Sequence, residues 1–212
     1  MSKVALVWGA AGGIGRAIAG RLKADGWQVV AFSHHAEGLA EVAAHSFAAD
    51  VADPFAVQRA MLAASQEVGE AELFVYAVGD ITAEPMREMA PGAFRRIIDA
   101  NLTGAYHAAH HSLPLLAADA PLVFIGAVSE RMRLPGLSAY AAAKAGLEAF
   151  AEALRKEERK RRVIVVRPAA VNTAFWSKVP FKMPGTALSP EAVAEKVVEA
   201  VKTSHQGALD IA

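Results

Sequence analysis

Short apolar runs rich in β-branched residues recur along the chain, separated by longer stretches with helical periodicity. An apolar run of four to eight residues between turn residues is typical of a strand buried on both faces. The pattern predicts five strands, at Val4 to Trp8, Gln28 to Phe32, Leu73 to Ala77, Leu122 to Gly126 and Val163 to Arg167. Two weaker strands are predicted at "HSFAA" and "ALDIA", residues 45–49 and 208–212.

The stretches between the strands predict helices, and residues that favour helix starts stand at some of their ends, such as Ser189 with Pro190. The predicted helices are Ile14 to Ala24, Pro54 to Glu67, Ala93 to Ala117, Tyr140 to Arg159 and Pro190 to Thr203. Strand and helix alternate along the whole length, which favours an α/β fold, a Rossmann-type doubly wound parallel sheet with helices on both faces. We expect one domain, residues 1–212, with its chemistry in loops after the carboxyl ends of strands.

Composition and charge exclude several classes of function. The 22 basic side chains of Lys and Arg balance 22 acidic ones, so the chain lacks the positive excess with which proteins bind nucleic acids or anionic membranes. It contains no cysteine, which excludes disulfides and thiolate metal sites and suits a reducing compartment. The amino terminus has no pattern of a signal peptide, and no apolar run reaches membrane-spanning length. We therefore expect a cytoplasmic protein.

A glycine-rich turn, "GAAGGIG", follows the first predicted strand and opens the first predicted helix. Glycines let the backbone turn sharply and approach a pyrophosphate closely, while the amino end of a helix presents free N–H groups to an anion. The simpler alternative is a tight strand-to-helix turn without a ligand. Its place between a first strand and a helix, with a second strand about 20 residues later, favours phosphate binding.

The spacing of this turn, Gly9 to Gly13 to Gly15, resembles that of the classical short-chain dehydrogenases/reductases (SDR family). The resemblance continues along almost the entire chain. It implies an oxidoreductase that transfers a hydride between a nicotinamide dinucleotide and a carbonyl or secondary alcohol. It also implies that the turn binds the cofactor through Gly9, Gly12, Gly13, Ile14 and Gly15.

Further cofactor contacts follow from the same resemblance. "AADVAD" places Asp50 and Val51 where the family contacts the adenine, although Asp50 could simply form a turn. Gly79 in "YAVG" matches the glycine of the family's Asn-Asn-Ala-Gly, but both asparagines are absent, so the local backbone must be braced from elsewhere. In "VRPAAVNT", the residues that match the segment over the nicotinamide are Pro168, Val171 and Thr173.

The choice between NADP and NAD depends on the end of the second strand, "AFSHH". An acidic residue there would bind the ribose hydroxyls of NAD and repel the 2′-phosphate of NADP. Ser33 and His34 stand there instead, and Arg16 could add positive charge. We predict NADP, with NAD as the alternative.

Tyr140 and Lys144 lie four residues apart on a predicted helix and therefore on one face of it. By the resemblance, Tyr140 is the general acid for reduction and the general base for oxidation, and Lys144 holds the nicotinamide ribose. Positive charge from Lys144 and the oxidised nicotinamide is expected to favour the tyrosinate. Asn101, in the middle of the long predicted helix, is expected to hold a water that links Lys144 to solvent.

The substrate-binding serine of the family is not at its usual place, where this chain has Ala127. Ser129, two residues later, would point to the same side of an extended strand end and could replace the hydroxyl. Ser138 is expected to cap the helix that carries Tyr140. We predict Ser129 as the fourth catalytic residue.

Residues 172–188 form the longest stretch without periodicity, and the aromatic residues Phe175, Trp176 and Phe181 suggest a lid over an apolar small-molecule substrate. His107 and His111 share a helix face but have no apparent third ligand, so no metal site is predicted. The resemblance also implies a homodimer or homotetramer formed through the two long helices. Two rival functions remain, a catalytically weak or inactive dinucleotide-binding regulatory protein and an isomerase or dehydratase.

Overall fold

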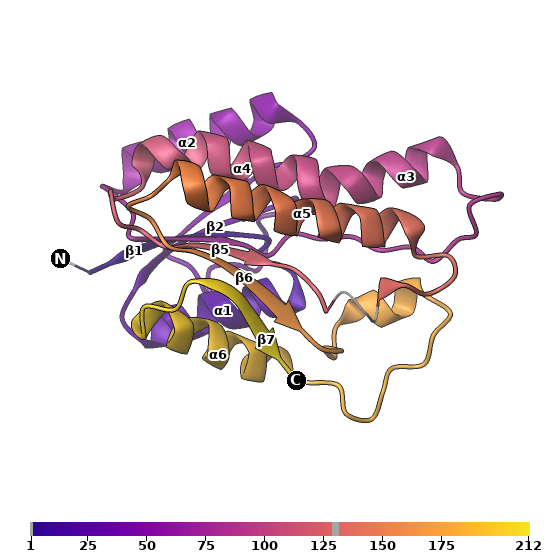
Figure 1. Cartoon of the computed structure of the whole chain (residues 1–212). Helices are drawn as coiled ribbons and strands as arrows, with labels where there is room; N and C mark the ends of the chain where they lie inside the picture. Colours follow the sequence, from indigo (N-terminus) through magenta and orange to yellow (C-terminus); the bar gives the residue numbers. More distant parts are fainter. Residues whose placement is uncertain (1, 129–131) are drawn as a thin grey trace.

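Seven parallel strands form one sheet in the computed structural model, which describes residues 2–128 and 132–212 (Figure 1). The strands are β1 (Val4–Trp8), β2 (Gln28–Ser33), β3 (His45–Ala48), β4 (Leu73–Tyr76), β5 (Leu122–Ile125), β6 (Val163–Pro168) and β7 (Gly207–Ile211). Their order is β3-β2-β1-β4-β5-β6-β7, so the chain leaves β1 toward one edge and later returns beside it as β4. Such a reversal opens a crevice at the carboxyl ends of the strands.

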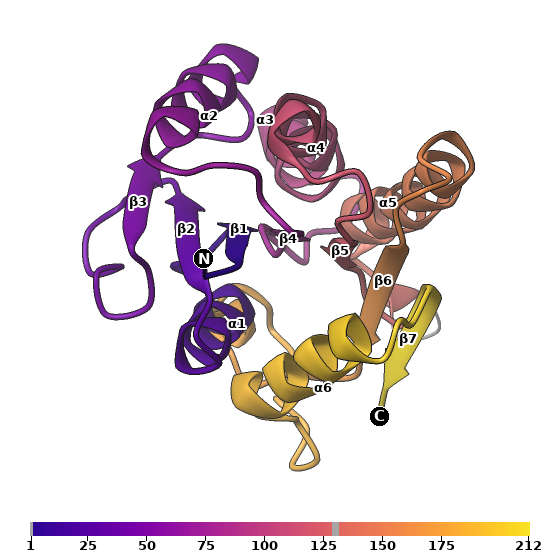
Figure 2. The same cartoon turned by 90° about the vertical axis from the view of Figure 1, so that its left-hand side faces the viewer.

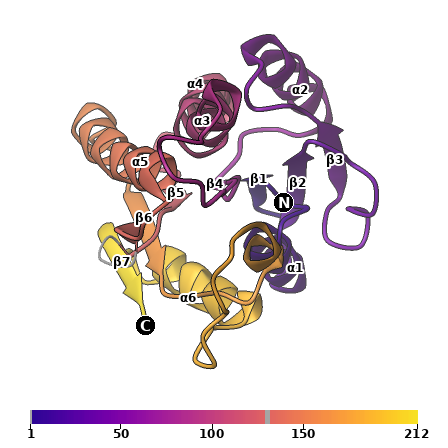
Figure 3. The same ribbon diagram turned by 90° about the vertical axis from the view of Figure 1, so that its right-hand side faces the viewer.

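Helices cover both faces of the sheet (Figures 2 and 3). One face carries α1 (Gly13–Ala24) and α6 (Pro190–Lys202), which pack against each other. The other carries α2 (Pro54–Glu67), α3 (Pro91–Ile98), α4 (Gly104–Ser112) and α5 (Ser138–Glu157). Alternate residues of a strand point to opposite faces, so Leu6 and Trp8 of β1 pack in the core under α2, α4 and α5, and Val7 packs in the core under α1 and α6. The predicted fold class is confirmed.

All seven predicted strands are present, and four of the five predicted helices match within two residues at each end. The predicted helix from Ala93 to Ala117 is interrupted instead. It consists of α3, a π-helical turn η1 (Asp99–Thr103), α4 and a short 3₁₀ turn η2 (Leu113–Leu115). The π-turn surrounds Asn101, which brings an irregular backbone to a predicted site residue.

The alternation of strand and helix fails between β2 and β3. Residues 34–44, all of which the structure describes, form turns rather than a helix. Leu39 and Ala43 of this connection are buried in the same core cluster as α1. These two side chains cover the part of the sheet that a helix would cover in a longer crossover. Among the described residues, no helix is both long and apolar enough to cross a membrane.

Candidate active site

An open cleft of about 1420 Å³ lies at the carboxyl ends of the strands. Sites for drug-sized ligands measure about 300–1,000 Å³, so this cleft has room for a dinucleotide together with a substrate. Most of the predicted site residues line it: Gly9, Gly12, Gly13, Ile14, Ser33, His34, Asp50, Val51, Gly79, Tyr140, Lys144, Pro168, Val171 and Thr173. The structure thus brings together residues from six separate parts of the chain.

The glycine turn has the backbone geometry that its composition predicts. Gly9 has a φ of +85°, and a Cβ atom there would lie 2.6 Å from the nitrogen of Val78. A Cβ on Gly15 would lie 2.2 Å from the carbonyl oxygen of Gly9, so Gly15 permits close packing under the turn and does not itself line the cleft. Gly12 and Gly13 are exposed, and no described side chain caps α1, so its first-turn N–H groups are available to an anion.

The end of β2 presents Ser33 and His34 to the cleft. His34 Nε2 lies 3.9 Å from Asp50 Oδ2, so these two cleft residues are neighbours. Asp50 also accepts a hydrogen bond from the Ala52 amide at 2.9 Å, which makes it a turn-forming residue as well. Arg16 does not serve the cleft: its guanidinium donates to Glu41 at 2.6 Å and to the Gly38 carbonyl at 2.9 Å.

Tyr140 and Lys144 lie on α5 with their polar ends in the cleft. Lys144 is only 3% exposed, and its Nζ donates to the carbonyl of Ile125 at 2.7 Å and lies 5.8 Å from the centre of the Tyr140 ring. Burial lowers the pKa of Lys144 to about 8 despite the nearby carboxylate of Glu148. Burial raises the pKa of Tyr140 above its ordinary value.

The protein's own groups shift the pKa of Tyr140 upward, whereas the predicted stabilisation of the tyrosinate also depends on the positive charge of an oxidised nicotinamide. Lys144 directs its ammonium to the Ile125 carbonyl, and desolvation of the phenol is what raises the pKa of Tyr140. The protein alone therefore holds Tyr140 protonated at neutral pH, in the form that can donate a proton.

Asn101 is fully buried behind the cleft, in the π-turn. Its amide nitrogen donates to the carbonyls of Asp80 at 2.7 Å and Ile97 at 2.9 Å. Its Oδ1 atom has no hydrogen-bond partner within the described part of the chain. A Cβ on Gly79 would lie 3.0 Å from this oxygen and 3.8 Å from Lys144 Nζ. Because an unpaired buried oxygen is costly, Asn101 Oδ1 is a ready acceptor for a water or ligand group beside Lys144.

Tyr76 supplies a brace in the region where the family's asparagines are absent. It is fully buried, and its hydroxyl donates to the carbonyl of Ala100 in the π-turn at 2.8 Å. The turn can come this close because residue 104 is glycine, where a Cβ would lie 2.6 Å from the Tyr76 hydroxyl. Neither Tyr76 nor Asp80 was predicted as a site residue. The signal for Tyr76 was present, since a tyrosine in a buried strand needs a partner for its hydroxyl.

Residues 172–188 form one wall of the cleft. A bridge between Val171 and Leu188 closes the base of this segment, and Trp176 Nε1 donates to the Val171 carbonyl at 2.8 Å. A short 3₁₀ turn, η4 (Ala174–Lys178), brings Phe175 and Trp176 to the cleft surface, and Phe181 lines it further on. The wall is therefore partly apolar.

Alanine occupies the position of the family's substrate-binding serine. Ala127 lines the cleft, so the position of the family's serine faces the site without a hydroxyl. Ser129 lies outside the described residues, and its assignment stays a prediction. The expectation for Ser138 was wrong: α5 begins at Ser138 itself, and no described side chain makes a capping hydrogen bond there. The turn from Leu134 to Leu137 already leads the backbone into the helix, and Ser138 is exposed.

The histidines of α4 do not form a metal site with other described residues. His107 Nδ1 lies 2.8 Å from the carbonyl oxygen of Val51, which ties α4 to the loop after β3. Within residues 2–128 and 132–212, no three side chains of the metal-binding types His, Asp and Glu gather around one point.

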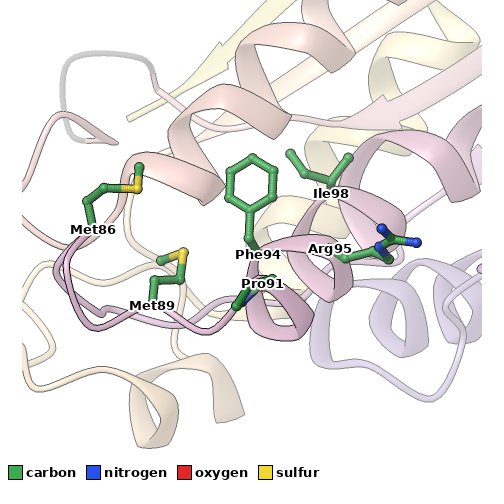
Figure 4. Close-up of a pocket in the computed structure, with 6 residues that line it drawn as sticks. All are labelled: Met86, Met89, Pro91, Phe94, Arg95 and Ile98. Atoms are coloured by element: carbon green, nitrogen blue, oxygen red, sulfur yellow. The ribbon is translucent and has the colours of Figure 1, made fainter.

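A second, apolar depression lies beside the cleft at α3 (Figure 4). Its lining consists of Met86, Met89, Pro91, Phe94, Arg95 and Ile98. Arg95 also lines the main cleft, so the two hollows adjoin at this residue.

A model of the family described as short chain dehydrogenase matches residues 3–183, most of the chain. The chain belongs to the short-chain dehydrogenase family. The family that the sequence resembles is thereby confirmed. Its curated relatives include the 3-oxoacyl-[acyl-carrier-protein] reductase MabA of Mycobacterium tuberculosis, 34% identical over 177 residues that cover 82% of this chain and 71% of the relative. The 2,3-dihydroxy-2,3-dihydro-p-cumate dehydrogenase of Pseudomonas putida is 33% identical over 192 residues, 84% of this chain and 74% of the relative.

Solved structures of this short-chain dehydrogenase's relatives have the same fold. The aldohexose dehydrogenase AldT of Thermoplasma acidophilum, solved without ligand, has a TM-score of 0.85 at 26% identity, covering 99% of this chain and 92% of that one. The alcohol dehydrogenase of Thermococcus sibiricus, solved with 5-hydroxy-NADP, has a TM-score of 0.89 at 23% identity, with coverages of 100% and 96%. The relatives named here are reductases and dehydrogenases, which makes this an oxidoreductase family.

Proposed function

We propose that this chain is an NADP(H)-dependent oxidoreductase that interconverts a carbonyl compound and a secondary alcohol. The observation that carries the proposal is the joint position of Tyr140 and Lys144. Both face a cleft whose other end is the glycine turn, and the unpaired oxygen of Asn101 lies beside Lys144. This arrangement offers a dinucleotide site and a proton donor in one cavity.

The cleft fits a nicotinamide dinucleotide. Exposed Gly12 and Gly13 and the amino end of α1 would hold the pyrophosphate, Asp50 and Val51 would contact the adenine, and Lys144 would bind the nicotinamide ribose. Pro168, Val171 and Thr173 would line the nicotinamide end, with Gly79 behind it. The bound dinucleotide supplies or accepts the hydride.

NADP rather than NAD is proposed because no acidic side chain stands at the end of β2. Ser33 and His34 would donate hydrogen bonds to the 2′-phosphate. Arg16 contributes no charge there while it is paired with Glu41, so the preference rests on these two side chains and on the absence of repulsion.

In reduction, Tyr140 would donate the proton that the substrate oxygen requires. The phenol is protonated at neutral pH and can donate, and the positive charge of Lys144 would offset the rise in its pKa that burial causes. In the reverse direction, the positive charge of Lys144 and of an oxidised nicotinamide would favour the tyrosinate. Asn101 Oδ1 would hold a water that links Lys144 to solvent, from which the proton is replaced. Ser129 would hydrogen-bond the substrate oxygen in place of the serine absent at Ala127.

The substrate is proposed to be a small molecule with an apolar part, because Phe175, Trp176 and Phe181 line the cleft. Since relatives bear the names of a 3-oxoacyl reductase and of a dihydrodiol dehydrogenase, 3-oxoacyl thioesters and cyclic alcohols belong among the first compounds to test. We further propose a cytoplasmic location and a homodimer or homotetramer.

The test is NADPH oxidation with a panel of aldehydes, ketones, quinones and 3-oxoacyl thioesters. We expect turnover with at least one class and a loss of at least a hundredfold in Tyr140→Phe, while that variant still binds NADPH. The second candidate is a dinucleotide-binding regulatory protein without turnover, which Ala127 at the serine position favours. Binding of NADPH without oxidation of any substrate, unchanged in Tyr140→Phe, would support that candidate and overturn the enzyme proposal.

A further inference from the structure

Three segments far apart in the sequence meet at Asp80, the residue after Gly79. Its carboxylate accepts a hydrogen bond from Arg96 Nε on α3 at 2.6 Å and another from Lys178 Nζ on the η4 turn at 2.6 Å. Its carbonyl accepts from the side-chain amide of Asn101 at 2.7 Å. The carboxylate side chain is only 14% exposed, whereas those of Arg96 and Lys178 are 57% and 50% exposed.

The contact between Asp80 and Lys178 places the cleft wall next to the buried polar groups. A Cβ on Gly79 would lie 3.4 Å from Cζ of Phe175, and Lys178 Nζ lies 6.0 Å from the centre of the same ring. Phe175 thus packs at Gly79, close to the same point that Asn101 Oδ1 and Lys144 Nζ approach. A shift of the η4 turn would move this ring relative to Lys144.

The charge of Asp80 is firmly held. Burial by itself would raise the pKa of this carboxyl, but hydrogen bonds from Lys178 and Arg96 outweigh it and hold the pKa below its ordinary value. Hydrogen bonds between ionised partners are shorter and about twice as strong as neutral ones. Removing one partner leaves a largely desolvated carboxylate with a single cation, which costs more than the loss of an exposed ion pair.

We infer that Asp80 is a positioning residue of the site, which fixes the η4 turn through Lys178 and the orientation of the Asn101 amide through its own carbonyl. The predicted effect on turnover rests on the proposed function, whereas the contacts of Asp80 are independent of it. Asp80 accepts no proton in the reaction and contacts no reacting atom. Through these two contacts it holds Phe175 and Asn101 at Gly79, next to Lys144.

A double-mutant cycle between Asp80→Asn and Lys178→Met tests the inference. We expect each single variant to lower kcat about tenfold and to change the dissociation constant of NADPH by less than about threefold, since the glycine turn and the adenine contacts lie elsewhere. The double variant should lose no more than Asp80→Asn alone, because Asp80→Asn already removes the link to Lys178. Lys178→Arg keeps a cation and should retain at least half of kcat.

The matched control is Lys196→Met, which removes another exposed lysine from an ion pair, with Glu199 on α6, far from the cleft. It should leave kcat unchanged. Additive losses in the double variant, or no loss in Lys178→Met, would overturn the inference. Lys178 is half exposed, so its variants should fold even if those of Asp80 do not.

A second readout does not depend on turnover. Trp176 lies on the η4 turn, and its fluorescence, isolated by comparison with Trp176→Phe, reports the seating of the turn. Acrylamide should quench Trp176 at least twice as strongly in Asp80→Asn and Lys178→Met as in the wild type and in Lys196→Met. Equal quenching in all four proteins would contradict the inference. Stronger quenching in the two variants of a protein that turns over no substrate would support the role of the Asp80–Lys178 contact in holding the η4 turn. It would overturn the proposed function instead.

Discussion

At the scale of single residues, Lys144 stands in an environment that disfavours its charge. Its pKa of about 8 lies below the ordinary 10.5, so between these values the unfolded chain binds the proton more tightly than the folded chain. Stability therefore rises with pH through this window, and below pH 8 the full penalty is present. A pKa shift of this size corresponds to a penalty of about 3 kcal/mol in the free energy of unfolding. Replacing Lys144 by an apolar residue would remove this penalty but would also lose the hydrogen bond to Ile125, which offsets about 1 kcal/mol of the gain in stability.

We expect Lys144→Met to be more stable than the wild type by about 2 kcal/mol at pH 7. The advantage should shrink as the pH rises from 8 to 10. Urea unfolding at several pH values measures both quantities. Lys156→Met, at an exposed position near the end of α5, serves as the control and should keep the wild-type pH dependence. The burial of a charged Lys144 would not explain the result if Lys144→Met were less stable than the wild type at pH 7. The same holds if the difference in the free energy of unfolding between the two proteins were equal at every pH.

Ser33 gives a test of cofactor choice. Ser33→Asp places a carboxylate at the end of β2, where it would repel a 2′-phosphate. We expect the affinity for NADPH to fall at least tenfold and that for NADH to stay within about threefold, as measured by the fluorescence of the bound cofactors. Ser65→Asp, on the exposed surface of α2, should change neither. An equal loss of affinity for NADPH and NADH would mean that the new carboxylate disrupts the whole site. The loss would then not report on a contact with the 2′-phosphate.

The sequence was sufficient to predict that Tyr140, Lys144 and Gly9 share one site, because the family resemblance depends on local spacing, on a helix face and in a turn. Asp80 could not be predicted in the same way. Its partners Arg96 and Lys178 are 16 and 98 positions away in the chain, and only the folded sheet brings them together. Likewise, the burial that sets the pKa of Tyr140 is a property of the assembled cleft.

At the scale of elements, the π-turn between α3 and α4 depends on a neighbouring strand. Tyr76 of β4 donates to its Ala100 carbonyl, and Gly104 leaves the space for this contact. Helical periodicity predicted one continuous helix over residues 93–117. The one glycine before Pro114 is Gly104, and a single glycine inside a helical pattern does not by itself end a helix. The turn arises from a tertiary hydrogen bond, which no local pattern encodes.

Tyr76→Phe tests this dependence. The variant leaves the Ala100 carbonyl without its buried donor, so we expect a loss of about 1–2 kcal/mol in the free energy of unfolding. Because the same turn carries Asn101, kcat should fall at least threefold. Tyr106→Phe is the matched control, since Tyr106 is 48% exposed on α4, and it should change neither quantity. If the two variants behave alike in urea unfolding and in turnover, Tyr76 does not brace the turn.

At the scale of the whole molecule, the strand order follows from rules that the sequence pattern already invokes. The chain passes outward from β1 to β3 with α1 on one face of the sheet, returns past β1 to β4, β5 and β6 with α2 to α5 on the other face, and reaches β7 through α6. The cleft forms at this reversal, which is why residues as distant as Gly9 and Thr173 share one cavity. The volume of the cleft and the position of its aromatic wall depend on side-chain packing across the sheet. The pattern of hydrophobic and polar residues along the sequence could therefore not predict them.

The predicted homo-oligomer is a property of the molecular surface. Ala142, Ala145 and Ala149 form an exposed stripe of small side chains on α5, and Phe94 on α3 and Tyr106 on α4 are 40% and 48% exposed. Small side chains allow helices of two copies to approach closely, so we expect light scattering to give at least twice the mass of one chain. Ala149→Arg should yield the monomer, and arginine is a good helix former that leaves α5 intact. Leu62→Arg, at a 63% exposed position on α2, should keep the wild-type mass. A wild-type monomer, or an Ala149→Arg protein of unchanged mass, would show that the face of α5 is not the interface.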